Sequence, residues 1–381
     1  MKIGIEGQRL YRKKKHGMDM VALELIKNLQ KLDTKNEYVV FVKPDEDNNC
    51  IPSAPNFKIV ELAGGPYPTW EQLALPKAAK NEGCDILHCT SNTGPIRSEV
   101  PLITILHDII YLESISIFKK AGTWYQKLGN MYRRWVVPPV VKKSLRVSTV
   151  SNFEKERIKS FMGLGDNLVA IYNGVGKHFQ KIDDEQLLQE AKRKYNLPDK
   201  FLFFLGNTDP KKNTPNVLKA FADFNNDSTV KYKLVMLDYE ESALQTILKD
   251  IGHPELREDI FLTGYVVNTD LPAIINQCEV FLYPSLRESF GIPILEGMAC
   301  GVPVITSNTS SMPEVAGGAA ELVDPLKPEE ITAAINRILG DEKLYNSLVE
   351  KGMERAKQFS WEKIAGDYLN LYQEVYNEIK G

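Results

Sequence analysis

Short apolar runs alternate with longer helical patterns along the whole chain. The runs form two series, with strands predicted at Lys2–Glu6, Tyr38–Val42, Ile86–His88, Leu102–Leu106, Val147–Val150 and Val169–Tyr172, then at Phe201–Leu205, Lys233–Leu237, Ile260–Leu262, Val280–Tyr283 and Val302–Thr306. Helices are predicted between them, among others at Asp19–Leu32, Asn216–Phe224 and Glu329–Leu339. Nearly continuous apolar strands that alternate with helices are typical of parallel sheets covered by helices, so the predicted fold class is α/β.

The length of 381 residues predicts more than one domain. A single hydrophobic core stops growing at about 250–300 residues. Between the two series of strands lies a charged, helix-prone stretch, 177–200, that is typical of a connector. We therefore predict two Rossmann-like, doubly wound domains, 1–180 and 181–361, that face each other across a cleft. Ligands of such sheets bind beyond the carboxyl ends of the strands.

The composition is that of an ordinary globular protein, with 43% hydrophobic residues and a net charge of −3. The absence of a basic surplus argues against nucleic acid as the main partner. The five cysteines are odd in number and lack CxxC or Cys/His ligand spacing, which favours free thiols in a reducing compartment. The start MKIGIEGQRL lacks the apolar core of a signal peptide, and no apolar run reaches about 18 residues, so we expect a cytoplasmic protein.

Two glutamates, Glu288 and Glu296, stand eight positions apart in the most informative stretch, 283–305. Glu288 follows the predicted strand Val280–Tyr283. Glu296 lies in the first turns of a helix, because Pro293 suits the first helical position. That helix N-terminus offers free N–H groups and a positive dipole to an anion. Carboxylates beside an anion site suggest a ligand that is part sugar and part phosphate, which describes a nucleotide sugar.

A second candidate segment is FLFFLGNTDPKKN, residues 201–213. A buried strand runs into Gly206, and the turn that follows presents Lys211 and Lys212. A leaving nucleoside diphosphate needs fixed cations when no metal is present, and lysine supplies a compact one. The alternative is a solvated lysine turn without a ligand.

A third candidate is the predicted strand 102–106, which ends in His107-Asp108. A histidine at the carboxyl end of a strand can donate to a phosphate or sugar oxygen and titrate near neutrality. The alternative is a histidine that Asp108 fixes as a loop brace. His88 ends the preceding strand and is interpreted as structural. No GxGxxG motif occurs, and Gly163 is interpreted as a helix stop.

Residues 114–153 contain no acidic side chain, and basic and aromatic residues are interleaved there. The basic residues are Lys119, Lys120, Lys127, Arg133, Arg134, Lys142, Lys143 and Arg146, and the aromatic ones are Phe118, Trp124, Tyr125, Tyr132 and Trp135. Such a surface would attract anionic lipid headgroups and suit a lipid-diphosphate-linked acceptor. The alternative is a solvated basic face whose aromatic residues belong to the core.

The pattern Glu-x7-Glu, with Phe290-Gly291 inside it and an Ala-Cys-Gly-Val-Pro-Val tail, resembles the donor site of family-four retaining glycosyltransferases of the GT-B fold. The segment 201–213 resembles the same family's Gly-Arg-Leu-Asp-Pro-Arg-Lys-Asn. The resemblance covers most of residues 85–325 and is thin before residue 80. It also implies that a final helix, 362–381, crosses back to the first domain.

The resemblance implies roles for individual residues. Glu288 would contact hydroxyls of the transferred sugar, Glu296 would hold the ribose, and Lys212 would contact the donor diphosphate. Further implied sites are catalytic His107 and Asp108, and donor-binding Gly17, Gly206, Lys211, Gly264, Tyr265, Phe290, Gly291 and Ile292. The chain departs from the family where Asn207 replaces an arginine, so Lys211 or Arg287 would have to supply that cation. His16 likewise stands where a second glycine precedes Gly17.

Two segments that match the family also have structural interpretations. Ser151 or Asn152 is expected to cap a helix. Ser311-Met312-Pro313-Glu314 fits a capping box, which makes Glu314 structural. The overlapping Met312-Pro313-Glu314-Val315 resembles a segment of the family's mannosyltransferases, but it is too general to assign mannose.

The predicted function is metal-independent, cofactor-free transfer of a sugar from a nucleoside-diphosphate sugar to a sugar or lipid-linked acceptor, with retention at the anomeric carbon. Polysaccharide, lipopolysaccharide or glycolipid assembly is the expected setting, with peripheral contact at the inner face of the membrane through 114–153. The alternatives are a nucleotide-sugar epimerase or hydrolase on the same fold, and a catalytically silent partner subunit.

Overall fold

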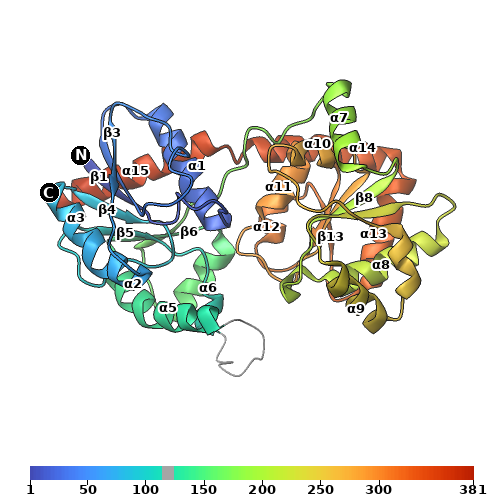
Figure 1. Ribbon diagram of the computed structural model, residues 1–381, viewed down its shortest axis with the longest axis horizontal. Coiled ribbons are helices and arrows are strands. Elements are labelled where there is room, and N and C mark those ends of the chain that lie inside the picture. The colour runs from blue at the N-terminus through green and yellow to red at the C-terminus, as the bar shows by residue number, and fades with distance from the viewer. Residues whose placement is uncertain (114–123) are drawn as a thin grey trace. The chain divides into compact units, whose positions relative to one another are not determined.

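The computed structural model describes residues 1–113 and 124–381, and the side chains of residues 124–127 lie outside the description. The chain divides into two compact units (Figure 1). The N-terminal domain comprises Met1–Gly174 and Trp361–Gly381, and the C-terminal domain comprises Val175–Ser360. Each unit holds one parallel sheet with its own helices.

The sheet of the N-terminal domain is parallel throughout. Its strands are β1 (Lys2–Gly7), β2 (Glu37–Val42), β3 (Phe57–Glu61), β4 (Ile86–Cys89), β5 (Leu102–Ile105), β6 (Arg146–Thr149) and β7 (Leu168–Ala170). They are ordered β3-β2-β1-β4-β5-β6-β7. The winding direction therefore reverses between β1 and β4, and open parallel sheets bind ligands beyond the carboxyl ends of the strands at such a switch point.

The longer helices of this domain bury apolar side chains. The helices of the N-terminal domain are α1 (Gly17–Leu32), α2 (Tyr67–Thr69), α3 (Leu75–Asn81), α4 (Ile110–Glu113), α5 (Trp124–Lys143), α6 (Asn152–Met162) and α15 (Trp361–Lys380), with a π-helical turn at Trp70–Ala74. Leu25 and Leu29, four residues apart on α1, are fully buried. The ends of α6 match the predictions, since the Ser151 hydroxyl accepts from the Glu154 N–H at one end and Gly163 adopts a φ of 65° at the other.

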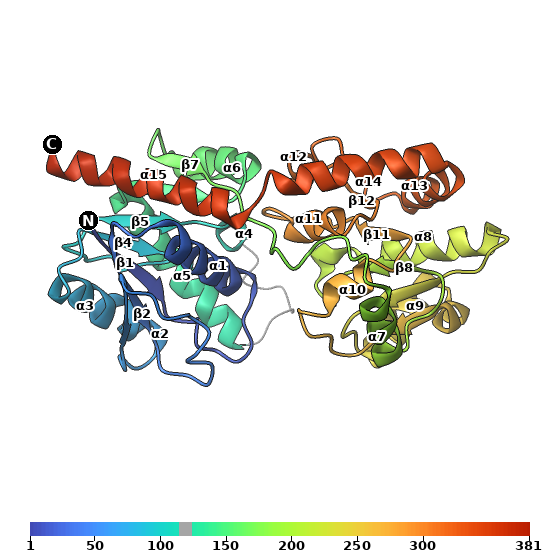
Figure 2. The ribbon, with the colours of Figure 1, turned by 90° about the horizontal axis from the view of Figure 1, so that it is seen from above.

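Helix α15 returns to the N-terminal domain after the whole C-terminal domain, as the family resemblance implied. It packs on α1 (Figure 2). The Tyr372 hydroxyl of α15 lies 2.7 Å from His88 Nδ1 on β4. Burial lowers the pKa of His88 to about 3, so the ring is neutral and joins the helix to the sheet. The structural interpretation of His88 is confirmed.

Replacing Tyr372 by phenylalanine is expected to lower the free energy of unfolding by about 1–3 kcal/mol. The smaller side chain fills the same space but leaves His88 Nδ1 without its partner, and His88 Nε2 already lacks one among the described residues. Denaturant unfolding measures the change. Tyr376→Phe, one turn further on, is the matched control, and a Tyr372→Phe protein as stable as this control would contradict the assignment.

The sheet of the C-terminal domain is also parallel throughout. Its strands are β8 (Phe201–Phe204), β9 (Lys233–Met236), β10 (Ile260–Leu262), β11 (Val280–Tyr283), β12 (Val304–Ser307) and β13 (Glu321–Val323). Their order, β10-β9-β8-β11-β12-β13, places the switch point between β8 and β11. The loops that follow these two strands are therefore neighbours.

The helices of the C-terminal domain are α7 (Glu185–Tyr195), α8 (Thr214–Asp227), α9 (Glu241–Ile251), α10 (Leu271–Ile275), α11 (Ile292–Ala299), α12 (Met312–Ala316), α13 (Pro328–Gly340) and α14 (Glu342–Lys357). Helix α8 packs on α13, and α11 packs on α14. Helix α11 also lies very close to β11, because a Cβ on Gly297 would stand 2.2 Å from the Phe281 ring. This close approach fixes the neighbouring Glu296 near the end of β11.

The α/β prediction is confirmed, and each predicted strand is present within a few residues of its predicted limits. The sequence interpretation missed two of the four edge strands, β3 and β13. Both carry charged residues and are only partly buried, so they lack the continuous apolar run of the inner strands. The stretch 177–200 contains helix α7, which belongs to the C-terminal domain.

Candidate functional site

The loop after β8 is folded by its own polar side chains. The Asn207 side chain accepts from the Asp209 N–H at 2.8 Å, and the Asp209 carboxylate accepts from the Lys211 N–H at 3.1 Å. This turn leads into one turn of 3₁₀ helix, Pro210–Lys212. Gly206 is required at its start, because a Cβ there would stand 2.2 Å from the Phe204 ring.

Asn213 fastens the end of this loop to the rest of the sheet edge. The residue has a φ of 63°, a conformation that asparagine tolerates better than most residues. Its buried amide donates to the carbonyls of Pro284 at 3.0 Å and Pro325 at 2.6 Å. The Lys211 carbonyl accepts from the Leu286 N–H at 2.7 Å, so the loops after β8 and β11 are bonded directly to each other.

These bonds bring Lys212 and Glu288 together. Lys212 Nζ lies 2.7 Å from Glu288 Oε1 and 2.7 Å from the Tyr283 hydroxyl, and 4.5 Å from the centroid of the Tyr283 ring. The side chains of Lys212 and Glu288 are only 14% and 11% exposed. Two of the three ammonium hydrogens are used within the described part of the chain, which leaves one for a ligand.

The sequence interpretation missed Tyr283. Burial and the nearby Glu288 charge raise the pKa of its phenol, so the hydroxyl stays protonated. Its position as the last residue of a predicted strand, five residues before Glu288, is the signal that could have suggested a role. It gives Lys212 a second anchor and a ring face.

Ser310 and Ser311 hold the backbone around Glu288. The Glu288 N–H donates to the Ser310 hydroxyl at 3.2 Å, and the Ser311 hydroxyl donates to the carbonyls of Glu288 and Phe290, at 2.9 Å each. The predicted capping box at Ser311 is therefore wrong, because the backbone of Ser311 is itself helical and its hydroxyl is not used as a cap. The hydroxyl shapes the Glu288 loop instead.

Helix α11 begins where this loop ends. Gly291, its N-cap, has a φ of 101°, which favours glycine, and Ile292 and Pro293 form the first turn as predicted. Phe290 is buried against Phe359, with ring centroids 5.8 Å apart. The N–H groups of the first turn are therefore presented at the switch point, next to Glu288.

Glu296 lies one turn into α11 and is partly buried. Burial raises the pKa of its carboxyl to about 7, against the opposing effect of the Lys212 charge. The site thus holds one carboxylate engaged with a cation, Glu288, and one carboxyl that titrates near neutrality. The sequence predicted both positions but not this difference between them.

Gly264 and Tyr265 lie further away along the same edge. They follow β10, which is separated from β8 by β9. Gly264 has a φ of 70°, and Tyr265 is 67% exposed. Their predicted contact with the nucleotide base stays a prediction.

In the N-terminal domain, His107 is buried and braced. Its ring Nε2 lies 3.0 Å from the Thr90 carbonyl, and its backbone N–H donates to the Asn92 side-chain oxygen at 2.6 Å. A carbonyl only accepts, so Nε2 carries the proton. Burial lowers the pKa of His107 below its usual value, which favours the neutral ring.

Asp108 does not act as the brace of His107. Its carboxylate accepts from the Ile110 N–H at 3.1 Å and so shapes the turn into α4. The predicted catalytic roles of His107 and Asp108 stay predictions.

Gly17 is the first residue of α1, and apart from its chain neighbours and its own helix backbone, no atom of the described residues lies within 4 Å of where its Cβ would be. The His16 N–H donates to the buried Asp19 carboxylate at 3.0 Å. Open space at the glycine is compatible with a ligand close to the backbone, and the phosphate contact of Gly17 stays a prediction.

The basic and aromatic stretch is described only in part. Phe118, Lys119 and Lys120, and the side chains of Trp124, Tyr125 and Lys127, lie outside the described residues. Tyr132 is half-buried and its hydroxyl donates to Glu71 at 2.6 Å, whereas Trp135 is 67% exposed. The aromatic residues of this stretch thus serve both interior and surface.

Within residues 1–113 and 124–381, membrane-spanning helices and clusters of metal-ligating side chains are absent. No helix there has the length and apolar character needed to cross a membrane. No group of three or more His, Cys, Asp or Glu side chains there is arranged to hold a metal ion. The predicted metal independence stays a prediction.

Solved structures resemble the chain over nearly its full length. Sucrose-phosphate synthase from Thermosynechococcus elongatus superposes with a TM-score of 0.76 at 18% identity, over 99% of each chain. Anabaena Alr3699/HepE in complex with UDP and glucose gives 0.72 at 16% identity, over 98% of this chain and all of the other. At these identities the likeness shows the fold alone, and it confirms the predicted GT-B architecture.

Sequence relatives are more informative. O-antigen chain mannosyltransferase B of Escherichia coli is 31% identical over 273 residues, which are 71% of this chain and 70% of that protein. Serotype-specific mannosyltransferase WbdA of Escherichia coli is 32% identical over 203 residues, but the match spans only 25% of WbdA. Residues 186–355 match the family described as glycosyl transferases group 1, and residues 16–177 match glycosyltransferase family 4. Both halves of the chain match these families, and O-antigen chain mannosyltransferase B, at 31% identity, is matched over 70% of its length. The chain therefore belongs to the group 1 glycosyltransferases.

Proposed function

We propose that the protein transfers a sugar from a nucleoside-diphosphate sugar to an acceptor hydroxyl, with retention at the anomeric carbon. The observation that carries the proposal is the bonded pair of Lys212 and Glu288 at the switch point. Glu288 stands four residues before α11 begins. Lys212 and the N–H groups of α11 would stabilise the leaving diphosphate. Glu288 would accept hydrogen bonds from the sugar hydroxyls.

In the proposed reaction, the bond between the anomeric carbon and the diphosphate oxygen breaks first, with an oxocarbenium-like transition state. The acceptor oxygen bonds to the same face of that carbon, and its proton passes to the departing diphosphate. Glu296 would hold the ribose, and Gly206, Lys211 and Gly291 would line the phosphates. No metal or other cofactor takes part in this proposal, because fixed protein charges and dipoles meet the negative charge.

The relatives support a narrower proposal for the substrates. Since the relative that is 31% identical is named an O-antigen chain mannosyltransferase, we infer a hexose donor, with mannose as the first sugar to test. Assembly of a polysaccharide, lipopolysaccharide or glycolipid at the cytoplasmic face of a membrane is the corresponding setting. On α5, the exposed Leu128, Met131 and Trp135 recur at spacings of three and four residues, which supports peripheral contact with that membrane.

The experiment that tests the function has two arms. In the first, thermal unfolding is followed with nucleoside diphosphates and nucleotide sugars, and a ligand at 100 times its dissociation constant should add about 2.7 kcal/mol of stability. In the second, the stabilising donor is incubated with candidate acceptors and the transferred sugar is measured. Acceptor-independent release of free sugar would point to the hydrolase alternative, and no binding of any nucleotide would point to the silent subunit.

Nucleoside-diphosphate binding is expected to strengthen as pH rises through about 7, where the Glu296 carboxyl loses its proton. A ribose hydroxyl donates better to a carboxylate than to a neutral carboxyl. Titration calorimetry across this range measures the effect. Glu296→Gln is the control, because it leaves only the pH dependence of the diphosphate itself. A Glu296→Gln protein with the wild-type pH dependence would remove Glu296 from the nucleotide site.

The same pKa fixes the sign of a stability effect in the free protein. Between the ordinary carboxyl value of 4.5 and about 7, the native state binds the Glu296 proton and the unfolded state does not. The free energy of unfolding therefore falls as pH rises through this range. Glu296→Gln should remove this fall.

A further inference from the structure

A second switch point, that of the N-terminal sheet, carries a pocket of about 260 Å³. Its lining includes Arg9, Arg12, Tyr67, Thr93, Tyr132 and Arg133. The two N-terminal arginines follow the carboxyl end of β1, and the threonine follows that of β4. The pocket therefore lies where open parallel sheets bind their ligands.

The charge of the pocket is one-sided. Three guanidinium groups line it, those of Arg9, Arg12 and Arg133, and no carboxylate does. Within the described residues none of the three forms an ion pair with an acidic side chain. The sequence shows that residues 114–153 cannot add a carboxylate, because that stretch contains none. Glu6, Asp19 and Glu71 interact electrostatically with Arg9 from outside this lining, and the guanidinium groups that line the pocket are suited to an anion.

Behind the arginines, a buried carboxylate fixes the polar wall. Glu71 is fully buried and accepts hydrogen bonds from Tyr67 at 2.7 Å, from Tyr132 at 2.6 Å, and from Thr93. Gln72 bonds to the same carboxylate at 2.9 Å. The hydroxyls of both tyrosines are thereby directed to Glu71, so their rings and remaining lone pairs hold fixed positions. A wall held in this way needs little ordering when a ligand binds.

Arg9 is the part of the pocket that most clearly lacks a partner. Its guanidinium lies over the Tyr67 ring, 5.0 Å from the centroid. Its Nε is buried and has no hydrogen-bond partner among the described residues. A buried N–H that lacks a partner in the free protein is satisfied when a ligand supplies an acceptor. The planar guanidinium matches a phosphate through two parallel hydrogen bonds.

We propose that this pocket binds a phosphate group carried by the sugar acceptor. The inference rests on the proposed transferase function and adds the chemical class of the acceptor. The arginines would hold the phosphate, and the Tyr67 hydroxyl oxygen would accept a hydrogen bond from a hydroxyl of the adjoining sugar, since the Tyr132 oxygen already accepts from the Gln72 amide at 2.9 Å. The volume is slightly below the about 300–1,000 Å³ of pockets for drug-sized ligands, which suits one sugar phosphate unit. That unit is either a soluble sugar phosphate or the head of a lipid-linked one.

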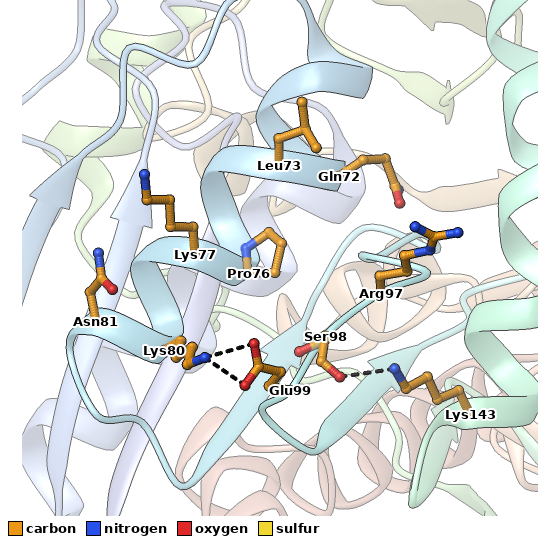
Figure 3. A pocket seen from close by; sticks show the side chains of 10 residues that line it. All are labelled: Gln72, Leu73, Pro76, Lys77, Lys80, Asn81, Arg97, Ser98, Glu99 and Lys143. Carbon is orange, nitrogen blue, oxygen red and sulfur yellow. Dashed lines mark hydrogen bonds and ion pairs between the residues drawn. The ribbon is translucent and has the colours of Figure 1, made fainter.

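A larger pocket in the same domain does not qualify as this site. It measures about 600 Å³ and is lined by side chains of α3 and the π-helical turn, by residues 97–99, which precede β5, and by Lys143 (Figure 3). Two of its four cations already have partners, since Lys80 pairs with Glu99 at 2.6 Å and Lys143 donates to the Ser98 carbonyl at 2.8 Å, and Glu99 adds a carboxylate to the lining. It supplies a control residue, Lys77, with no role in the proposal.

The test measures binding of glucose 1-phosphate to the full chain by titration calorimetry, with methyl glucoside as the uncharged comparison. The wild-type protein should bind the phosphate and not the glycoside, and saturating GDP or UDP should leave that binding unchanged. Arg9→Gln should weaken it about ten- to hundredfold, the value expected for lost hydrogen bonds to a charged group. Arg12→Gln should weaken it as well, and Lys77→Gln should not.

Three results would overturn the proposal. They are equal affinity of the Arg9→Gln and wild-type proteins, equal binding of methyl glucoside, and displacement by the nucleoside diphosphate, which would place the probe in the donor site. If Arg9→Gln has a lowered melting temperature, Arg9→Lys and Arg12→Gln give the answer. The lysine keeps a charge but loses the two-bond geometry, so it should bind weakly.

Vesicles distinguish the two sources of the phosphate. Phosphatidic acid in phosphatidylcholine vesicles should compete with glucose 1-phosphate if the acceptor is lipid-linked, and should not compete if it is a soluble sugar phosphate. The donor function is tested separately. Glu288→Gln should lower the turnover of transfer about 10²–10³-fold and keep glucose 1-phosphate binding, whereas Arg9→Gln should keep nucleoside-diphosphate binding. Sugar transfer without phosphate binding would contradict the proposed phosphate pocket. Phosphate binding without any sugar transfer would contradict the proposed transferase function.

Discussion

Replacing Glu288 by glutamine is expected to lower the turnover of sugar transfer about 10²–10³-fold while nucleotide binding is retained. The glutamine keeps an oxygen for Lys212, which also stays bonded to Tyr283, so the loop should keep its shape. What is lost is the charged acceptor of the hydrogen bonds from the hydroxyls of the transferred sugar. Steady-state kinetics with the donor identified by thermal unfolding measures the effect.

The control for this prediction is Glu329→Gln, the same change at an exposed position in the first turn of α13. It should leave turnover unchanged. If the Glu288→Gln enzyme works within a few-fold of wild type, Glu288 is a loop residue and the proposed mechanism fails. A large loss of nucleotide affinity would instead place Glu288 at the nucleotide and away from the sugar.

The second large effect is expected for Lys212→Ala. One charged hydrogen bond to the diphosphate is lost, which corresponds to about 1.5–3 kcal/mol, or about ten- to a hundredfold in affinity. Binding of the corresponding nucleoside, which has no phosphate, should change little. Calorimetric titration of the nucleoside and its diphosphate, each with wild type and variant, gives the comparison directly.

Lys249→Ala, at an exposed position on α9, controls for a general loss of positive charge. Lys211→Ala asks a different question, namely whether this residue supplies the cation that Asn207 lacks. If Lys212→Ala weakens the nucleoside and the diphosphate equally, the lysine shapes the site and does not bind phosphate.

The sequence predicted the donor site well because its chemistry follows strand ends. An apolar run predicts an inner strand, and the next polar residues then lie at the carboxyl edge of the sheet. In this way Lys212 and Glu288 could be assigned to one edge without coordinates. That they are bonded depends on β8 and β11 being neighbours, which the strand order decides and the local pattern does not contain.

The sequence could not predict partners that come from the backbone or from distant loops. His107 has the residue type and position of a titrating group, yet the Thr90 carbonyl holds its ring and burial favours the neutral form. Ser311 likewise fits the local pattern of a helix cap, but its hydroxyl is used by a loop more than twenty residues earlier. The pocket around Arg9 depends on Glu71, which stands in a stretch where the family resemblance was thin.

The return of α15 to the N-terminal domain has a consequence for how the protein is made. Trp361, Tyr368 and Tyr372 complete the core of that domain, but the ribosome adds them only after all of Val175–Ser360. At about 5–20 residues per second, the delay is on the order of ten to forty seconds. During this time the surface that α15 will cover on α1 and β4 is open to water. Chaperone binding to the newly made N-terminal domain, or its aggregation, is therefore expected during the interval before α15 is synthesised.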